Sequence, residues 1–529
     1  MIKVAIGIIG IGYQGFRGFI SLLAIEEILR NDGIKIGGII IIEPDSDARK
    51  DCERISKVLY FPVKLFSSLD EFFYFIERKK DNFLKKFNCI IFYDASPTKW
   101  HSKNLNQIIY YNLYYNLNIP TYYFGEKPIS TDKFQLYAWL KEEKLKFYCN
   151  FTELQNSAYL TLKSYLDETN FQINSFKFWR ASSIGFQKLI DPIQRTGITG
   201  GALEDKGIHD VALTIDLLGG VKKLKLKLKK QENKKDPESV MVVSPKIEPI
   251  EIHFMPANLY SLFSPKPLFM DNTGEKVIDE IFKIEETSTK EYKKYWYFAA
   301  DSEFKMKIIW SLQDERQIEA KYYFSWAGLS EEIKKEIEKE IIIKLPTHLD
   351  WLGEKEESVP QHVPIIGGIR YPFTETRLMI VEGVNKKDNR EEKIICNLLR
   401  KSNLGIRNLW IYKLVQGKNK AELNIKENEF QFSQNFLARM FYNVILSVVE
   451  DVKKNKEKEK SERENFYEKI GKDITCWAHL IIAEARERAF KKKLKVNQLK
   501  EIESVPSKKS LVKEVSKESM ERYKKTFLI

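Results

Sequence analysis

The first stretch of the chain, residues 2–18, reads IKVAIGIIGIGYQGFRG. Its apolar, β-branched opening predicts a buried strand, and Gly10, Gly12 and Gly15 then form a G-x-G-x-x-G loop. The next residues are apolar at every third or fourth position, which predicts a helix that ends near Gly33. A second apolar run, IKIGGIIII, predicts another buried strand. This order of elements is typical of a dinucleotide-binding domain.

Each glycine of the loop has a physical role in such a domain. Gly10 permits a tight turn, Gly12 lets a pyrophosphate approach the backbone, and Gly15 allows the helix to pack closely. The helix N-terminus then faces the phosphates. Tyr13 and Gln14 lie inside the loop and are candidate cofactor contacts with the glycines.

An acidic residue, Glu43, ends the second strand. Its carboxylate would accept hydrogen bonds from the ribose hydroxyls of a dinucleotide, which favours NAD over NADP. Arg49 and Lys50 follow closely and would suit a 2′-phosphate, so NADP stays open as the alternative.

A third buried strand lies in residues 88–101, NCIIFYDASPTKWH. The polar residues after it predict a turn and a helix start at the carboxyl edge of the sheet, where ligands of open α/β sheets bind. We therefore expect four cofactor contacts here, Ser96, Pro97, Thr98 and His101.

The stretch TYYFGEKP, residues 121–128, places Glu126 and Lys127 at the end of a further short strand. Both residues are expected at the cofactor site, because the strand belongs to the same predicted sheet. The alternative is that Lys127 is an ordinary surface lysine.

A second group of polar residues lies in TGITGGALEDKGIHDVALTIDLLGG, residues 196–220. Paired glycines precede an amphipathic helix, and the spacing of four between Asp205 and His209 places them on one helical face. The alternative is a buried histidine that is hydrogen-bonded by a helix neighbour.

The glycine loop, SPTKWH, GEKP and GGALEDKGIHD, in this order, resemble the glucose–fructose oxidoreductase/inositol dehydrogenase (Gfo/Idh/MocA) family. The resemblance implies an α/β fold, with an N-terminal Rossmann domain and a C-terminal α/β domain whose open, largely antiparallel sheet shields the nicotinamide and often serves oligomerisation. It also implies a catalytic set of Lys127, Asp205 and His209.

The expected organisation has three parts. Residues 1–149 would form the NAD(P)-binding domain, and residues 150–491 the substrate-binding and oligomerisation domain, with insertions near 230–300 and 329–365. Residues 492–529 would form a charged tail. Within the second part we expect strands at 221–230 and 322–328, and helices at 434–452 and 473–490.

The predicted activity is NAD(P)-dependent hydride transfer to or from a sugar, a polyol or a related hydroxy or keto compound, with Lys127 and His209 handling the proton. Two alternatives stay open: an NAD-retaining glycoside hydrolase and a non-catalytic dinucleotide-binding regulator. Asn150, Trp179 and Arg180 are candidate substrate contacts, although an arginine or tryptophan on a strand is more often structural.

Composition limits the other classes of function. Lysine and arginine total 87 of 529 residues against 74 acidic ones, but the charges are interspersed, so solvated faces are expected rather than a nucleic-acid site. No apolar run is long enough for a membrane helix. Five scattered cysteines and isolated histidines predict neither disulfides nor a metal site. We expect a cytoplasmic homo-oligomer, a dimer or a tetramer.

Overall fold

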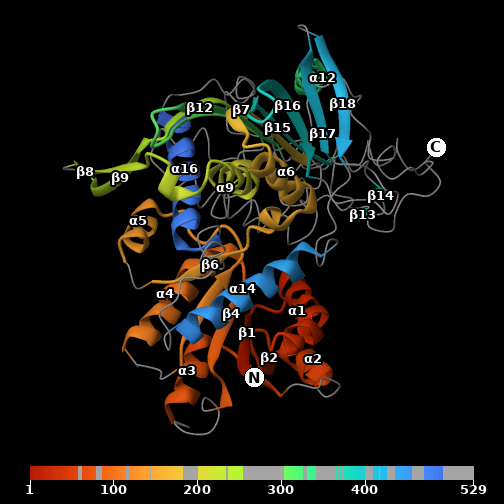
Figure 1. Cartoon of the computed structure of the whole chain (residues 1–529). Helices are drawn as coiled ribbons and strands as arrows, with labels where there is room; N and C mark the ends of the chain where they lie inside the picture. The colour runs from red at the N-terminus through yellow and green to blue at the C-terminus, as the bar shows by residue number, and fades with distance from the viewer. Residues whose placement is uncertain are drawn as a thin grey trace, which may run out of the picture.

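Figure 1 shows the computed structural model of the chain. The structure describes residues 1–56, 62–78, 86–114, 119–142, 145–182, 201–233, 236–253, 303–325, 331–340, 365–366, 369–370, 375–398, 409–415, 418–425, 435–454 and 470–491. Much of both predicted insertions and the whole predicted tail lie outside the described residues.

The N-terminal part is built on a six-stranded parallel sheet with the order β3-β2-β1-β4-β5-β6. Its strands are β1 (Ile2–Ile9), β2 (Ile34–Ile42), β3 (Val63–Phe66), β4 (Cys89–Asp94), β5 (Thr121–Gly125) and β6 (Phe147–Cys149). The chain reverses its direction of travel across the sheet at β1, so a crevice opens between the carboxyl ends of β1 and β4. The expected Rossmann-type sheet is confirmed.

Helices connect these strands, as the apolar periodicity predicts. They are α1 (Tyr13–Asn31), α2 (Ser46–Ser56), α3 (Leu69–Arg78), α4 (Thr98–Tyr114) and α5 (Lys133–Lys141). All six residues of β4 are buried, which is typical of a parallel strand with packed side chains on both faces.

The second sheet has eight strands in the order β10-β11-β12-β7-β15-β16-β17-β18. The β7–β12 pair is parallel and the other neighbouring pairs are antiparallel, so the expected largely antiparallel sheet is confirmed. The strands are β7 (Gln172–Ser182), β10 (Lys246–His253), β11 (Glu303–Ser311), β12 (Gln317–Ser325), β15 (Glu375–Asn385), β16 (Arg390–Asn397), β17 (Leu409–Val415) and β18 (Lys418–Ile425).

Alternate residues of the second sheet pack on opposite faces. On one face Tyr322 bonds Thr214 of α9 (Ile208–Leu217), and α6 (Ser157–Glu168) lies beside it (Figure 1). On the other face Trp179 and Tyr323 belong to a cluster that includes Ile333 and Ile337 of α12 (Glu331–Glu340). Part of the predicted second insertion therefore covers this sheet face.

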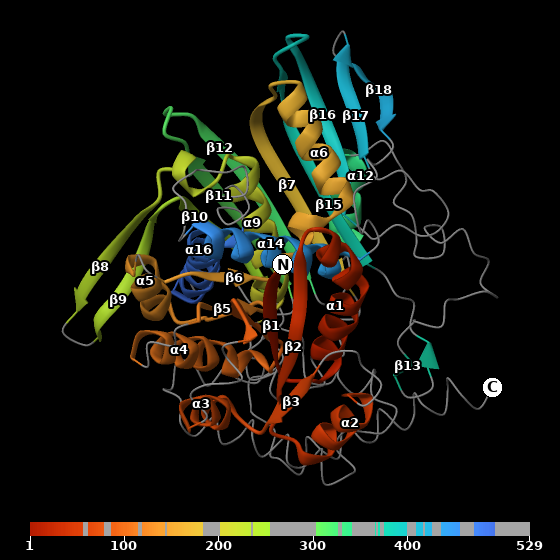
Figure 2. The same cartoon turned by 60° about the horizontal axis from the view of Figure 1, so that its bottom comes forward.

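A separate hairpin of β8 (Lys227–Asn233) and β9 (Asp236–Ser244) projects from the second sheet (Figure 2). The strand expected across 221–230 is only partly present, because a 3₁₀ turn, Val221–Lys223, follows two glycines with positive φ and delays the strand. The strand expected at 322–328 is described as far as Ser325. The other short elements are η2 (Thr152–Gln155), η3 (Leu203–Gly207), β13 (Ile365–Ile366) and β14 (Ile369–Arg370).

The last two described helices, α14 (Phe436–Lys454) and α16 (Lys472–Lys491), confirm the predictions at 434–452 and 473–490. Phe436, Met440, Val444 and Val448, which recur every four residues along α14, are buried. α14 lies against the first sheet beside α1, and Asp451 accepts a hydrogen bond from Tyr122 of β5 at 2.7 Å (Figure 1). The C-terminal helices therefore return to the N-terminal sheet.

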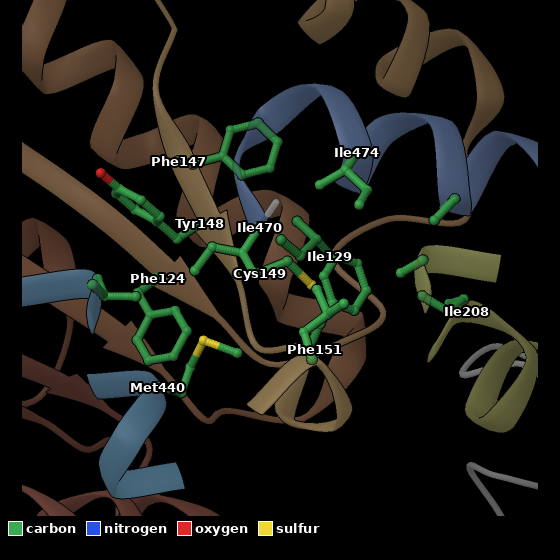
Figure 3. Packing of buried hydrophobic residues seen from close by; sticks show 14 of the residues in the cluster. Phe124, Ile129, Phe147, Tyr148, Cys149, Phe151, Ile208, Met440, Ile470 and Ile474 are labelled. Atoms are coloured by element: carbon green, nitrogen blue, oxygen red, sulfur yellow. The ribbon is translucent and has the colours of Figure 1, made fainter. Parts of the chain in front are cut away.

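One continuous apolar core joins the strand ends to these helices. Figure 3 shows Phe124 of β5 near Met440 of α14, and Ile470 and Ile474 near Cys149 at the end of β6. Burial of each large apolar side chain stabilises the folded state by about 1.5–3 kcal/mol. The loops after β5 and β6 are therefore anchored on a stable core. No helix in the described part of the chain is long and apolar enough to span a membrane.

Candidate active site

The glycine loop leaves the N-terminus of α1 open to a ligand. Gly10 has a φ of +79°, and a Cβ on Gly15 would lie 1.9 Å from the Gly10 carbonyl oxygen, so neither position tolerates a side chain. A Cβ on Gly12 would meet open space. No side chain caps α1 and its first turn carries no acid, so its N–H groups suit a phosphate.

Glu43 holds the glycine loop in place from the end of β2. Its Oε2 accepts the Ile11 N–H at 2.8 Å and its Oε1 accepts the Asp45 N–H at 3.0 Å. A carboxylate has further lone pairs, so Glu43 retains acceptor capacity toward a ribose. Arg49 donates instead to the main-chain oxygens of Glu43 and Pro44.

The turn after β4 is fixed by Asp94, a buried residue that the sequence analysis did not select. Asp94 accepts hydrogen bonds from the Ser96 N–H and hydroxyl, from Asn104 and from Tyr123. His101 is buried, with Nδ1 2.8 Å from the Pro128 oxygen and Nε2 2.7 Å from the Ser96 oxygen. His101 therefore joins the two loops and has no ring nitrogen left for a ligand.

Glu126 directly follows β5 and lines the cleft that is described below. It accepts hydrogen bonds from the Tyr93 hydroxyl of β4 and from Asn150 Nδ2, the latter at 2.6 Å. Burial and the nearby Glu126 raise the pKa of Tyr93 well above its ordinary value, so the phenol stays a donor. Asn150 Oδ1 is buried without a partner among the described residues, which suits a ligand donor.

Lys127 and Asp205 meet in the structure, although 78 residues separate them. Lys127 Nζ donates to Asp205 Oδ1 at 2.6 Å and to the Asp205 main-chain oxygen. The segment around Asp205 is a π-helical turn, η3, and not the continuous α-helix that the sequence predicts. Lysine has three N–H donors, so one remains for a substrate oxygen.

His209 lies in the first turn of α9, directly after the π-helical turn. Its Nδ1 is buried and has no partner in the described part of the chain, and its ring is 6.3 Å from the ring of Phe151. Burial, Lys127 and Arg180 lower the pKa of His209 well below its ordinary value. The imidazole is therefore neutral near pH 7 and can accept a proton.

A cleft of about 1120 Å³ connects the glycine loop with Lys127 and Asp205. Most of the predicted cofactor residues line it, namely Gly10, Gly12, Gln14, Glu43, Ser96, Pro97, Thr98, His101, Glu126 and Lys127. Gly15 lies behind the loop, and the side chain of Tyr13 is outside the described set. His209 and Asn150 are not among the lining residues.

The cleft is also lined by residues that the sequence did not identify as candidates. Residues 67–70 line it from the end of β3, and Trp100, Lys103, Asn104 and Gln107 line it from α4. Their spacing of three or four along a helix that follows the Ser-Pro-Thr turn is the pattern that would have identified them.

Two predicted substrate contacts have other roles in the structure. Trp179 is 3% exposed and packs in the cluster beneath α12, because it lies on the sheet face opposite α9. Arg180 is 4% exposed and bonds to Glu153 and Asp210. Trp179 is committed to apolar packing and Arg180 to buried ion pairs, so the proposed substrate site below does not include them.

A distant histidine supports the loop that carries Lys127. His479 of α16 accepts the Ile129 N–H on Nε2 at 3.0 Å, and its Nδ1 donates to the Thr475 oxygen at 2.7 Å. Burial and the nearby Lys127 lower the pKa of His479 from 6.5 to about 4. Protonation of Nε2 would break the bond to Ile129.

This linkage predicts a loss of stability in mild acid. Between pH 6.5 and 4 the unfolded chain binds a proton at residue 479 that the folded chain excludes, so the free energy of unfolding falls by up to about 3 kcal/mol as the pH drops. A His479→Gln variant keeps an acceptor for Ile129 and cannot titrate. Urea unfolding across this range should show a flatter pH dependence for the variant; parallel curves would contradict the role of His479.

Within the described residues, no group of three or more histidine, cysteine, aspartate or glutamate side chains is placed to hold a metal ion.

The sequence matches no protein-family model and no curated protein. Solved structures do resemble the chain. Levoglucosan dehydrogenase, in a complex with NADH and levoglucosan and in one with NADH and L-sorbose, is 10% identical with a TM-score of 0.50. Each alignment covers 92% of this chain and 98% of that chain. The chain has the fold of levoglucosan dehydrogenase.

GenD2 from gentamicin A biosynthesis, solved in complex with NAD, is 12% identical over 93% of this chain and 95% of that chain, with a TM-score of 0.45. The match to levoglucosan dehydrogenase spans the N-terminal sheet and the second sheet together, so the fold that the motifs predict is confirmed across both.

Proposed function

We propose that the chain is an NAD(P)-dependent oxidoreductase that transfers a hydride between the cofactor and a CH–OH or C=O carbon of a sugar, a polyol or a related compound. The observation that carries the proposal is the meeting of Lys127 and Asp205 at the wall of the same cleft that the glycine loop lines, with His209 four residues further on. Levoglucosan dehydrogenase, which has this fold, binds NADH and a sugar-like ligand.

The cofactor fits residues of this chain. The uncapped N-terminus of α1 would hold the pyrophosphate, and Glu43 at the cleft wall would hold the ribose. The carboxylates of Glu43 and Asp45 would repel the extra phosphate of NADP, and Arg49 is engaged with main-chain oxygens, so we favour NAD. When bound, NAD would supply the hydride acceptor.

Oxidation of an alcohol requires a base for the hydroxyl proton and a cation for the developing alkoxide. His209 takes the first role, because its ring is neutral and its Nδ1, which has no partner in the described part of the chain, can accept the proton. Lys127 takes the second role, with Asp205 fixing its ammonium group and leaving one N–H for the carbinol oxygen. Asn150 is a candidate for a second substrate hydroxyl, through its Oδ1, for which the described residues offer no partner.

A cofactor-reduction screen tests this function. The purified chain is offered sugars, polyols and sugar acids, each with NAD and with NADP, and the formation of NADH or NADPH is followed by absorbance. Net reduction with at least one hydroxy compound, faster with NAD, is the expected result. Release of an aglycone from a glycoside without net NADH would favour a hydrolase, and cofactor binding without turnover on any class would favour a regulator.

A further inference from the structure

A buried ion cluster includes Asp210, the residue after His209. Arg180 of β7 donates Nη1 to Glu153 Oε1 at 2.9 Å, and its Nε and Nη2 donate to Asp210 Oδ1 at 2.9 and 2.6 Å. The side chains of Arg180 and Glu153 are 5% exposed and that of Asp210 is 2% exposed. Arg377 of β15, which is less buried, also donates to Glu153.

The cluster joins three elements around the start of α9. Glu153 lies on η2, Arg180 on the second sheet, and Asp210 directly follows His209 in the chain. The fork of Arg180 on Asp210 therefore fixes the first turn of α9, at the point where the π-helical turn ends.

The charges of the cluster also act on the imidazole. Burial comes first among the causes that lower the pKa of His209, Lys127 and Arg180 lower it further, and Glu153 and Asp205 raise it. Asp210 and Glu153, against the effect of burial, raise the pKa of Arg180, so the guanidinium is charged at every working pH. It is a permanent positive charge bound to Asp210, the residue after the proposed base.

Resting on the proposed function, we propose that Arg180 is a positioning residue for His209: its hydrogen bonds to Asp210 fix the turn of α9 that carries the imidazole, and they hold a permanent cation beside that turn. Arg180 itself does not contact the cleft, so this is an indirect role. It replaces the direct substrate contact that the sequence suggested.

A second ion pair of the same helix provides the comparison. Lys163 of α6 bonds Asp216 at the other end of α9 at 2.6 Å, and Asp216 is 6% exposed. This pair also anchors α9, but at the end of the helix away from His209. Loss of either pair removes an anchor of α9, whereas only the loss of Arg180 removes a cation that lowers the pKa of His209.

Histidine-selective NMR titration distinguishes the proposed role of Arg180 from a purely structural one. The chain has six histidines, and a His209→Gln variant assigns the signal of residue 209. In Arg180→Gln the midpoint of this signal should rise by on the order of one pH unit, because a nearby cation is lost. In Arg180→Lys the midpoint should lie close to the wild-type value, because the cation is kept. In Lys163→Gln the midpoint should stay at the wild-type value.

Arg180→Gln leaves Asp210 unpaired in the interior and can fail to fold. The double variant Arg180→Gln/Asp210→Asn removes the pair together, and Asp210→Asn alone keeps the cation, so these two variants differ only in Arg180. The midpoint of His209 should be higher in the double variant than in Asp210→Asn. Equal midpoints in these two folded variants, or an equal rise in Lys163→Gln, would overturn the proposal.

The titration does not depend on turnover. A shifted His209 signal in a chain that reduces no cofactor would leave the role of Arg180 intact and remove the proposed function. In an active enzyme the acid limb of kcat/KM should move up with the NMR midpoint, while NADH affinity stays at the wild-type value.

Discussion

Replacing Lys127 with methionine should lower kcat by about 10³-fold while NADH still binds with nearly wild-type affinity. Methionine fills a similar volume but offers neither a charge nor an N–H to the carbinol oxygen. The loss falls on kcat because the missing stabilisation acts on alkoxide charge that develops only in the transition state. Stopped-flow or steady-state turnover, together with NADH fluorescence titration, measures both quantities.

Lys133 is the matched control. Its side chain is 15% exposed, as that of Lys127 is, and it also pairs with carboxylates, Glu484 and Glu487, but it does not line the cleft. Lys133→Met should therefore reduce stability and leave kcat close to the wild-type value. Full turnover by Lys127→Met would remove this lysine from the chemistry.

The second large effect is expected at His209. A His209→Gln variant keeps a polar side chain of similar reach but cannot accept a proton near neutral pH, so kcat/KM should fall by about 10²–10⁴-fold. Because the pKa of His209 is lowered, the acid limb of the wild-type kcat/KM profile should lie below pH 6.5. In the variant this limb should disappear, since the group that titrates is gone.

Hydroxide would partly replace the missing base. The residual activity of His209→Gln should therefore rise steadily with pH, whereas a variant that had merely lost its fold would show no such rise. Retention of the wild-type acid limb would show that another group accepts the proton. NADH titration and thermal unfolding of the same sample exclude loss of the cofactor site as the cause.

Much of the N-terminal fold was predictable because neighbouring residues in the sequence determine it. A glycine loop between a β-branched strand and an amphipathic segment has few physical solutions, and the loop geometry at Gly10 and Gly15 is what those residues allow. The meeting of Lys127 with Asp205 was also expected, but from the order of several motifs and not from either residue alone.

The errors arose where contacts are distant in sequence. Trp179 and Arg180 are neighbours on β7, and alternation sends them to opposite faces of the sheet, but a strand pattern does not say which face meets α9 and which meets α12. The π-helical turn around Asp205 depends on the packing and hydrogen bonds around it. His479 gives no sign in the sequence of its bond to Ile129, 350 residues away.

That last bond has a consequence for the order in which the chain completes its fold during synthesis. During synthesis the nascent chain has already released the glycine loop, the Lys127 loop and α9 from the ribosome before residue 479 is made. Until α16 arrives, the backbone at Ile129 has no acceptor from this helix and Lys133 lacks its carboxylates. A translation product that stops short of α16 can therefore carry every residue of the proposed chemistry and still lack the support that aligns it.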